Sequence, residues 1–184
     1  MRKVERSEIL DYVTYTENRS ELRSQVLQEK DKRRIHLGSE LTFLFENTLT
    51  AKYQIQEMMR VERLVKEEAI LHEMQTYNDL LGDENELGCT LLIEIEDPSV
   101  RDVRLKELVS LPQHIYLKLE NGQKAFCSYD KEQVGEHKVS SVQFLKFKCD
   151  VKPIAIGCDH PQLCIEQELT PEQKETLSLD LSDS

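Results

Sequence analysis

Two segments of the chain carry the residue types that most often do chemistry. The first runs from Glu46 to Glu67 and is rich in glutamate and arginine, and the second runs from Cys158 to Cys164. Carboxylates transfer protons or bind metals, and guanidinium groups bind carboxylates and phosphates through paired hydrogen bonds. Cysteine and histidine are the usual ligands of zinc. Either use requires that the fold bring these side chains together.

Glu62 is the residue of the first segment that conflicts most with a purely structural interpretation. On a helical wheel it shares one stripe with Ile55, Met58, Met59 and Val65, so it is expected to project toward the core. A lone buried carboxylate is costly and must be paired, hydrogen-bonded or kept protonated. Glu62 is therefore either a catalytic acid or metal ligand, or one half of a structural ion pair with an arginine.

The other side of the same helix carries a polar face. It holds Gln56, Arg60, Arg63 and Glu67, and Glu57 lies one turn from Arg60. Such a face either binds a small anion through bidentate arginines or is solvated and held by weak ion pairs. A di-iron bundle is disfavoured, because that site needs Glu-x-x-His motifs on two helices and the sequence has none.

Cys158, His160 and Cys164 place three possible metal ligands close together in the second segment. In an extended segment positions i and i+2 point the same way, so Cys158 and His160 could converge on one ion. The spacing matches no zinc finger or ribbon, and a fourth ligand would have to come from elsewhere in the chain. These residues are weak candidates for a metal site, with buried thiols beside a turn as the alternative. No cofactor is predicted.

Composition excludes several classes of function. The sequence lacks the glycine-rich nucleotide loops, H-E-x-x-H and G-x-S-x-G. A net charge of −11 argues against binding nucleic acid or anionic membranes, which need a positive face. The one basic run, Lys30 to Arg34, is interpreted as the cations that close a helix. The absence of a signal-like or membrane-spanning apolar run predicts a cytoplasmic protein whose five cysteines are reduced.

Helices are expected mainly in the first half of the chain. Residues 1–16 are expected to be irregular or to form a short helix, and a firmer helix is predicted from Glu17 to Arg33. Between Leu49 and Leu81 the apolar residues fall on two stripes about 100° apart, which one straight helix cannot present to one core. A break is therefore predicted near Val65.

Strands dominate the second half of the chain. Alternating or continuous apolar runs predict strands at 35–37, 41–45, 91–95, 115–120, 123–129, 142–151, 154–156 and 163–168. Asn121-Gly122 is a strong hairpin signal and implies antiparallel pairing. A helix is expected after Asp97-Pro98, another after Thr170, and 180–184 is expected to be a frayed acidic tail. The chain is thus predicted to be a single α+β domain over residues 1–184, with a mostly antiparallel sheet.

Several of these segments together resemble an uncharacterised bacterial family that is known as a numbered domain of unknown function. The resemblance covers nearly the whole chain and rests on residues 41–47, 54–63, 77–78, 91–95 and 157–161. The positions that match its most specific block are the binding-site candidates: Glu46, Asn47, Gln56, Glu57, Arg60, Glu62 and Arg63. Cys158 and Cys164 lie outside the family pattern.

The resemblance also implies a biological setting. Genes of this family often neighbour those of rubrerythrin-like proteins and iron–sulfur oxidoreductases, so one of these is the expected partner. The first hypothesis is a non-enzymatic accessory or binding protein of a bacterial redox or oxidative-stress system. The alternatives are a small-anion-binding enzyme that uses the Glu/Arg cluster of residues 46–63, and a metal or redox sensor built on Cys158, His160 and Cys164. A homo-oligomer is compatible with each hypothesis.

Overall fold

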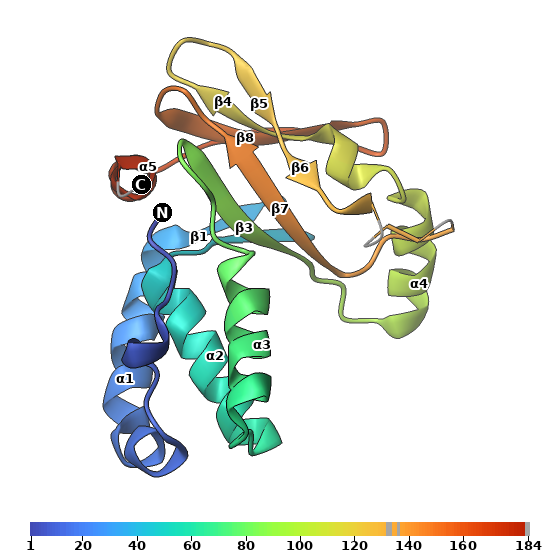
Figure 1. Ribbon diagram of the computed structural model, residues 1–184. Helices are drawn as coiled ribbons and strands as arrows, with labels where there is room; N and C mark the ends of the chain where they lie inside the picture. Colours follow the sequence, from blue (N-terminus) through green and yellow to red (C-terminus); the bar gives the residue numbers. More distant parts are fainter. Residues whose placement is uncertain (132–133, 136, 183–184) are drawn as a thin grey trace.

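The computed structural model describes residues 1–131, 134–135 and 137–182. Within them the chain forms three layers: a helical bundle, a first sheet (sheet A) and a second sheet (sheet B) (Figure 1). The helices lie mostly in the first half of the chain and the sheets mostly in the second. The predicted α+β class is confirmed.

The helical bundle contains α1 (Tyr12–Arg33), α2 (Thr48–Glu62) and α3 (Glu67–Asn78), preceded by a short 3₁₀ turn, η1 (Arg6–Glu8). The expected start of the first helix at Glu17 is wrong. The Asp11 carboxylate accepts the backbone N–H groups of Val13 and Thr14 and starts α1 five residues earlier. This cap outweighs the low helix propensity of the threonines that follow it.

The predicted break between α2 and α3 is confirmed. Arg63 adopts a left-handed backbone conformation, with φ of 54°, and its N–H donates to the Met59 carbonyl. This geometry ends α2 and lets the next helix leave at a new angle. The two apolar stripes then meet in one core, where Ile55 and Met59 pack with Ile70 and Met74.

Sheet A is antiparallel, with strands in the order β1-β2-β3-β7-β6. The strands are β1 (Arg34–Leu37), β2 (Leu41–Phe45), β3 (Glu86–Ile93), β7 (Val142–Lys148) and β6 (Ser128–Tyr129). The predicted central position of Leu41–Phe45 is confirmed, because β2 lies between β1 and β3 and every one of its residues is buried.

Sheet B covers one face of sheet A. Its order is β5-β4-β8-β9, from β4 (Ile115–Leu119), β5 (Lys124–Phe126), β8 (Pro153–His160) and β9 (Leu163–Glu168). Large apolar side chains of the two sheets, among them Phe43, Phe147, Leu117 and Ile156, form the main core. The other face of sheet A is turned toward the helical bundle (Figure 1).

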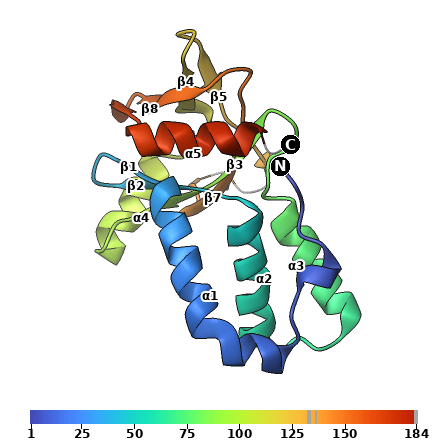
Figure 2. The ribbon, with the colours of Figure 1, turned by 90° about the vertical axis from the view of Figure 1, so that its left-hand side faces the viewer.

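Two further helices close the sides of the sandwich. In α4 (Pro98–Glu107) the predicted Asp97 cap is confirmed, and α5 (Pro171–Ser182) begins with the predicted Thr170–Gln173 capping box. Figure 2 shows α5 lying across the side of the two sheets, above the end of α1. Among the described residues, no helix has the length and apolar character to cross a membrane.

The expected frayed tail at 180–184 is wrong where it is described. Helix α5 continues through Ser182, and Asp180 is buried against α1. Its carboxylate accepts two hydrogen bonds from Arg33, at 2.8 and 2.9 Å. A buried ion pair holds this end of the chain in place, and residues 183–184 lie outside the described part.

Candidate functional site

A cavity of about 360 Å³ lies between sheet A and the ends of the bundle helices that are nearest to this sheet. Segments far apart in the sequence supply its walls: α1, β1, β2, α2, α3, β3 and β7. The lining residues, which define what we call the Glu46 pocket, are Lys30, Arg34, Leu44, Glu46, Ala51, Gln54, Tyr77, Leu80, Thr90, Leu92, Val142 and Phe144.

Strand register sets the sheet side of the pocket. Arg34 is paired with Leu44, Leu44 with Thr90, and Thr90 with Phe144, so these four residues form one row across β1, β2, β3 and β7. Directly paired residues of an antiparallel sheet project from the same face. The row therefore runs from a guanidinium through a hydroxyl to an aromatic ring.

Glu46 is the buried acid of the pocket, with 6% of its surface exposed. It follows β2 directly, and its N–H donates to the Gly88 carbonyl at 2.9 Å, which extends the pairing with β3 by one residue. One carboxylate oxygen accepts the Thr50 hydroxyl at 2.6 Å and the other accepts the Thr90 hydroxyl at 2.9 Å. Both oxygens are thus held in place by neutral donors.

Two cations line the same cavity. Lys30 is 9% exposed, and its ammonium lies 5.5 Å from the centre of the Tyr53 ring. Burial lowers the pKa of Lys30, and the attraction of Glu46 only partly offsets this effect. Arg34 contributes a buried Nε that has no hydrogen-bond partner among the described residues. Among the described residues that line the pocket, two basic groups therefore face one acidic group.

The remaining lining is aromatic and apolar. Burial raises the pKa of the Tyr77 phenol, and the nearby carboxylates Glu73, Glu62 and Glu46 raise it further, so the phenol is protonated at neutral pH and can donate a hydrogen bond. Val142 and Phe144 are exposed and lie at the pocket's rim. A ligand that meets these walls would have a charged group at one end and an apolar body.

Only one of the seven predicted binding residues lines this pocket. Glu46 does, whereas the neighbouring Asn47 caps α2: its side-chain oxygen accepts the Thr50 N–H at 2.9 Å. The Asn47 amide also donates to Glu29 at 3.2 Å. Asn47 therefore fixes the turn that places Glu46, and it contributes no group to the cavity.

Gln56 was predicted on the polar outer face, and this prediction is wrong. It is buried, and its side-chain oxygen accepts the backbone N–H of Leu10 at 2.7 Å while its amide donates to the Leu10 carbonyl at 3.2 Å. The segment before α1 folds back over α2 and covers this face, which a wheel of one helix does not show. Gln56 anchors that segment.

Glu57 and Arg60 belong to an ion-pair network between α1 and α2. Glu57 accepts two hydrogen bonds from Arg19, at 2.7 and 2.8 Å, and one from the Tyr15 hydroxyl at 2.7 Å. These donors lower the pKa of Glu57 to about 2. Arg60 lies 3.5 Å from the same carboxylate. Glu57 is thus a fully engaged structural acid.

The predicted core position of Glu62 is wrong. Glu62 is the last residue of α2 and is exposed, as is Val65, which has 77% of its surface accessible. The apolar stripe continues on the wheel past the point where the helix ends, so it predicts burial that the bundle does not provide. Arg63 is also exposed and forms the turn. The cluster of residues 46–63 therefore does not converge on one site.

The metal candidates also fail to converge. Cys158 and His160 are buried on one face of β8, but Cys164 is paired with Asp159 and projects from the opposite face. His160 accepts the Gln162 N–H through Nδ1 at 3.1 Å and bonds Ser110 through Nε2 at 3.0 Å. Among the described residues, no three His, Cys, Asp or Glu side chains form a metal-binding group.

Three thiols that are largely shielded from solvent are poorly suited to redox chemistry. Burial raises the pKa of Cys158 to about 11 and the pKa values of Cys127 and Cys149 to about 12. The reactive form of cysteine is the thiolate, which is scarce at neutral pH when the pKa is this high. This argues against a sensor built on Cys158.

Sequence reasoning missed the basic residues of the pocket. The run from Lys30 to Arg34 does close α1, which ends at Arg33, but Lys30 and Arg34 also face the Glu46 pocket. Their spacing of four residues at the end of a helix was the available signal. It could not be interpreted without the pairing of β1 with β2 and β3.

Two comparisons place the chain among known proteins. The DUF3501 signature, described as a protein of unknown function, matches residues 3–181. The crystal structure of a novel protein of unknown function from Burkholderia pseudomallei K96243 is similar, with a TM-score of 0.91 and 28% sequence identity over 98% of this chain and 100% of that one. No curated protein matches the chain. The chain belongs to the DUF3501 family.

Proposed function

We propose that this protein is a non-enzymatic binding protein that takes a small organic anion with an apolar body into the Glu46 pocket. Lys30, Arg34 and Glu46 together leave one positive charge to be balanced. A ligand with one carboxylate balances it, and the net neutral site would lower the cost of keeping these charges away from water.

The unpartnered Nε of Arg34 carries this proposal. A buried N–H without an acceptor costs roughly 1–3 kcal/mol, so folded proteins seldom retain one without a use. The guanidinium presents its N–H groups as a planar fork that matches a carboxylate. A ligand carboxylate on Arg34 would supply the acceptor that the described residues do not.

The apolar part of the pocket selects among anions. Leu44, Leu80, Leu92 and Phe144 line the cavity beside the charged groups. A small inorganic anion would leave these walls wet, whereas an aliphatic or aromatic body would cover them. The volume of about 360 Å³ falls within the range of small-molecule sites.

A binding role is favoured over catalysis by the groups present. The lining, within the part of the chain that is described, includes no histidine, cysteine or serine. Both oxygens of Glu46 accept threonine hydroxyls, so neighbouring side chains hold the carboxylate in one orientation. An accessory role beside a rubrerythrin-like or iron–sulfur partner is part of the proposal and rests on the family resemblance alone.

The buried position of Lys30 supports a second candidate function, which is enzymatic. A lysine that is desolvated and lies beside another cation is easier to deprotonate and can attack a carbonyl to form an imine with loss of water. The probe is pyruvate with borohydride, followed by mass spectrometry of the intact protein. Reduction that attaches the probe at Lys30 would establish an enzyme-like amine. An unmodified chain would leave binding as the function.

The binding proposal is tested by calorimetry with matched pairs of probes. Benzoate and hexanoate are compared with benzyl alcohol and hexan-1-ol, which keep the apolar body and lose the charge. We expect the acids to bind at least about tenfold more tightly than the alcohols, and Arg34→Met to remove this difference. Arg101→Met, on α4, is the matched control. Equal affinity of acid and alcohol, or no saturable binding of any acid, would contradict the proposal.

A further inference from the structure

A second concavity lies along α1 and beside α2. It has a volume of about 780 Å³ and is open to solvent. Its basic lining residues are Arg19, Arg23 and Arg60, and Ser20 and Ser24 supply hydroxyls. We call it the arginine groove. Within the described part of the chain, it shares no lining residue with the Glu46 pocket.

The periodicity of α1 explains why these side chains lie together. Arg19 and Arg23 are four residues apart, as are Ser20 and Ser24, so a row of arginines runs beside a row of hydroxyls on one side of the helix. Arg60 enters from α2, which packs against α1. The groove is therefore built from two elements that the α1–α2 interface holds rigidly.

The charge of the groove is incompletely balanced. Glu57 is engaged by Arg19 through two hydrogen bonds, and Arg60 approaches it only to 3.5 Å. The Nε of Arg60 is buried and has no hydrogen-bond partner among the described residues. Arg23 forms no ion pair within that part of the chain. Among these described residues, the guanidinium groups of Arg19, Arg23 and Arg60 against the Glu57 carboxylate leave an excess of two positive charges.

This excess is unusual in a chain with a net charge of −11. Scattered surface arginines in such a chain are expected to meet acidic neighbours, as Arg6 meets Glu67 at 2.7 Å. An uncompensated pair of positive charges flanked by hydroxyl donors matches the charge and the acceptor atoms of a phosphate group. Arginine forks are the preferred protein groups for this purpose.

We propose that the arginine groove is a second ligand site, which binds the dianionic phosphate group of a small phosphorylated molecule. Arg23 and Arg60 supply the charge, Ser20 and Ser24 supply hydrogen bonds, and Glu57 fixes the position of Arg19. The site stands independently of the Glu46 pocket, because the two are lined by different residues and require ligands of different charge. A phosphorylated ligand in the groove could thus be bound together with an organic acid in the pocket.

Nuclear magnetic resonance titration with inorganic phosphate tests the site. The titration is run at a pH of about 7.5, above the second pKa of phosphate, and at constant ionic strength set with chloride. We expect saturable shifts of the backbone amides of residues 19–24 and of the Arg60 Nε–H, all with one dissociation constant. Arg23→Gln should weaken binding about tenfold, since one charged hydrogen-bond partner is lost.

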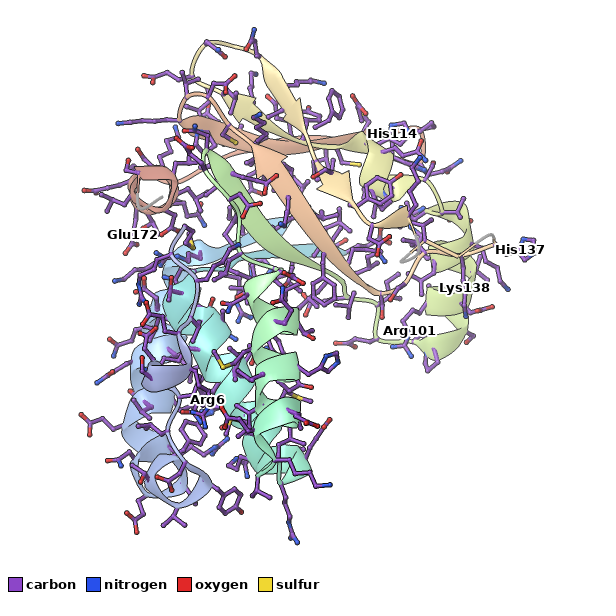
Figure 3. The ribbon with its side chains drawn as sticks, in the orientation of Figure 1. Arg6, Arg101, His114, His137, Lys138 and Glu172 are labelled. Atoms are coloured by element: carbon purple, nitrogen blue, oxygen red, sulfur yellow. The ribbon has the colours of Figure 1, made fainter. Side chains whose placement is uncertain are left out.

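Matched controls separate a built site from general charge attraction. Arg101→Gln removes one positive charge from α4, far from the groove (Figure 3), and should leave the phosphate affinity unchanged. Equal losses in Arg23→Gln and Arg101→Gln would overturn the proposal, as would shifts that rise linearly without saturation. Tighter binding of poly-glutamate than of phosphate at equal charge would also overturn it, because the groove would then be a docking surface for an acidic protein segment.

Discussion

Arg33 and Arg34 are adjacent in the chain, yet they meet opposite environments. Arg33 is buried at the junction of α1 and α5, where it donates two hydrogen bonds to Asp180 and further bonds to Glu29. Arg34 begins β1 on the face toward the Glu46 pocket, and its buried Nε has no partner among the described residues. The chain turns from helix to strand between them, which sends the two side chains to different layers.

The difference separates a structural charge from a charge that is kept for a ligand. At the α1–α5 junction every strong donor of Arg33 meets a carboxylate, so the pair fastens the C-terminal helix. In the pocket Lys30 and Arg34 face a single carboxylate that two threonines already engage. Burial of an unsatisfied charge costs stability, which is a common property of binding sites.

The largest predicted effect is the loss of stability when Arg33 loses its partner Asp180. Asp180→Ala leaves the Arg33 guanidinium buried without its main partner, and we expect the free energy of unfolding to fall by about 3 kcal/mol. Urea denaturation followed by circular dichroism measures this loss. Glu172→Ala, at the exposed start of the same helix (Figure 3), is the control and should change stability little. An equally small change for Asp180→Ala would mean that the Arg33–Asp180 ion pair does not stabilise the position of α5.

A second structural acid gives a pH-dependent effect. The pKa of Glu57 is about 2 in the folded protein, below its ordinary value of 4.5. A depressed carboxyl pKa stabilises the fold above the ordinary pKa, and this contribution disappears as the pH falls from about 4.5 toward 2. We expect the wild type to lose about 2 kcal/mol more than Glu57→Gln over this interval. Parallel curves for the two proteins would show that the Arg19–Glu57 pair contributes nothing.

For Arg34, which lines the Glu46 pocket, we expect a small effect on stability and a large effect on binding. Arg34→Met removes an N–H that has no partner, so the free energy of unfolding should change by less than about 1 kcal/mol. Affinity for benzoate should nevertheless fall about tenfold. Urea denaturation and calorimetry on the same preparation check both statements. A large loss of stability with unchanged affinity would place Arg34 with Arg33 as a structural charge.

The smallest effect expected is a gain of stability. The folded-state pKa of Lys30 is below the ordinary value of 10.5, so folding disfavours the protonated form of this side chain. The free energy of unfolding should therefore rise as the pH increases from the folded-state pKa to the ordinary pKa. Lys30→Met should therefore raise the free energy of unfolding at neutral pH by about 1 kcal/mol and weaken binding of the acids. A destabilised variant would show that Lys30 is held by attractions strong enough to outweigh burial.

Local signals in the sequence predicted much of the fold. The two apolar stripes between Leu49 and Leu81 predicted the break that Arg63 makes, and Asn121-Gly122 predicted the hairpin of β4 and β5. Both depend on nearby residues only. The start of α1 was not predicted, because the Asp11 cap stabilises a first turn whose threonines, Thr14 and Thr16, have low helix propensity.

The site was far less accessible to sequence reasoning. Glu46 was among the predicted residues, but its partners come from α1, β1, α3 and β3, and their meeting depends on strand register across sheet A. Register is set by long-range packing, which a single sequence does not display. The predicted positions of Glu62 and Gln56 were wrong for a related reason. A helical wheel does not show where a helix ends or which segments cover it.

The most direct test of the account is the side-chain resonance of the Arg34 Nε–H in the presence of benzoate. In the free protein this N–H has no acceptor among the described residues, and a bound carboxylate would provide one. We predict a saturable downfield shift of this resonance with benzoate and none with benzyl alcohol, while the Arg33 resonance stays fixed. If the Arg34 resonance does not move while benzoate binds, or moves equally with the alcohol, the claim that this arginine is kept for an anionic ligand is contradicted.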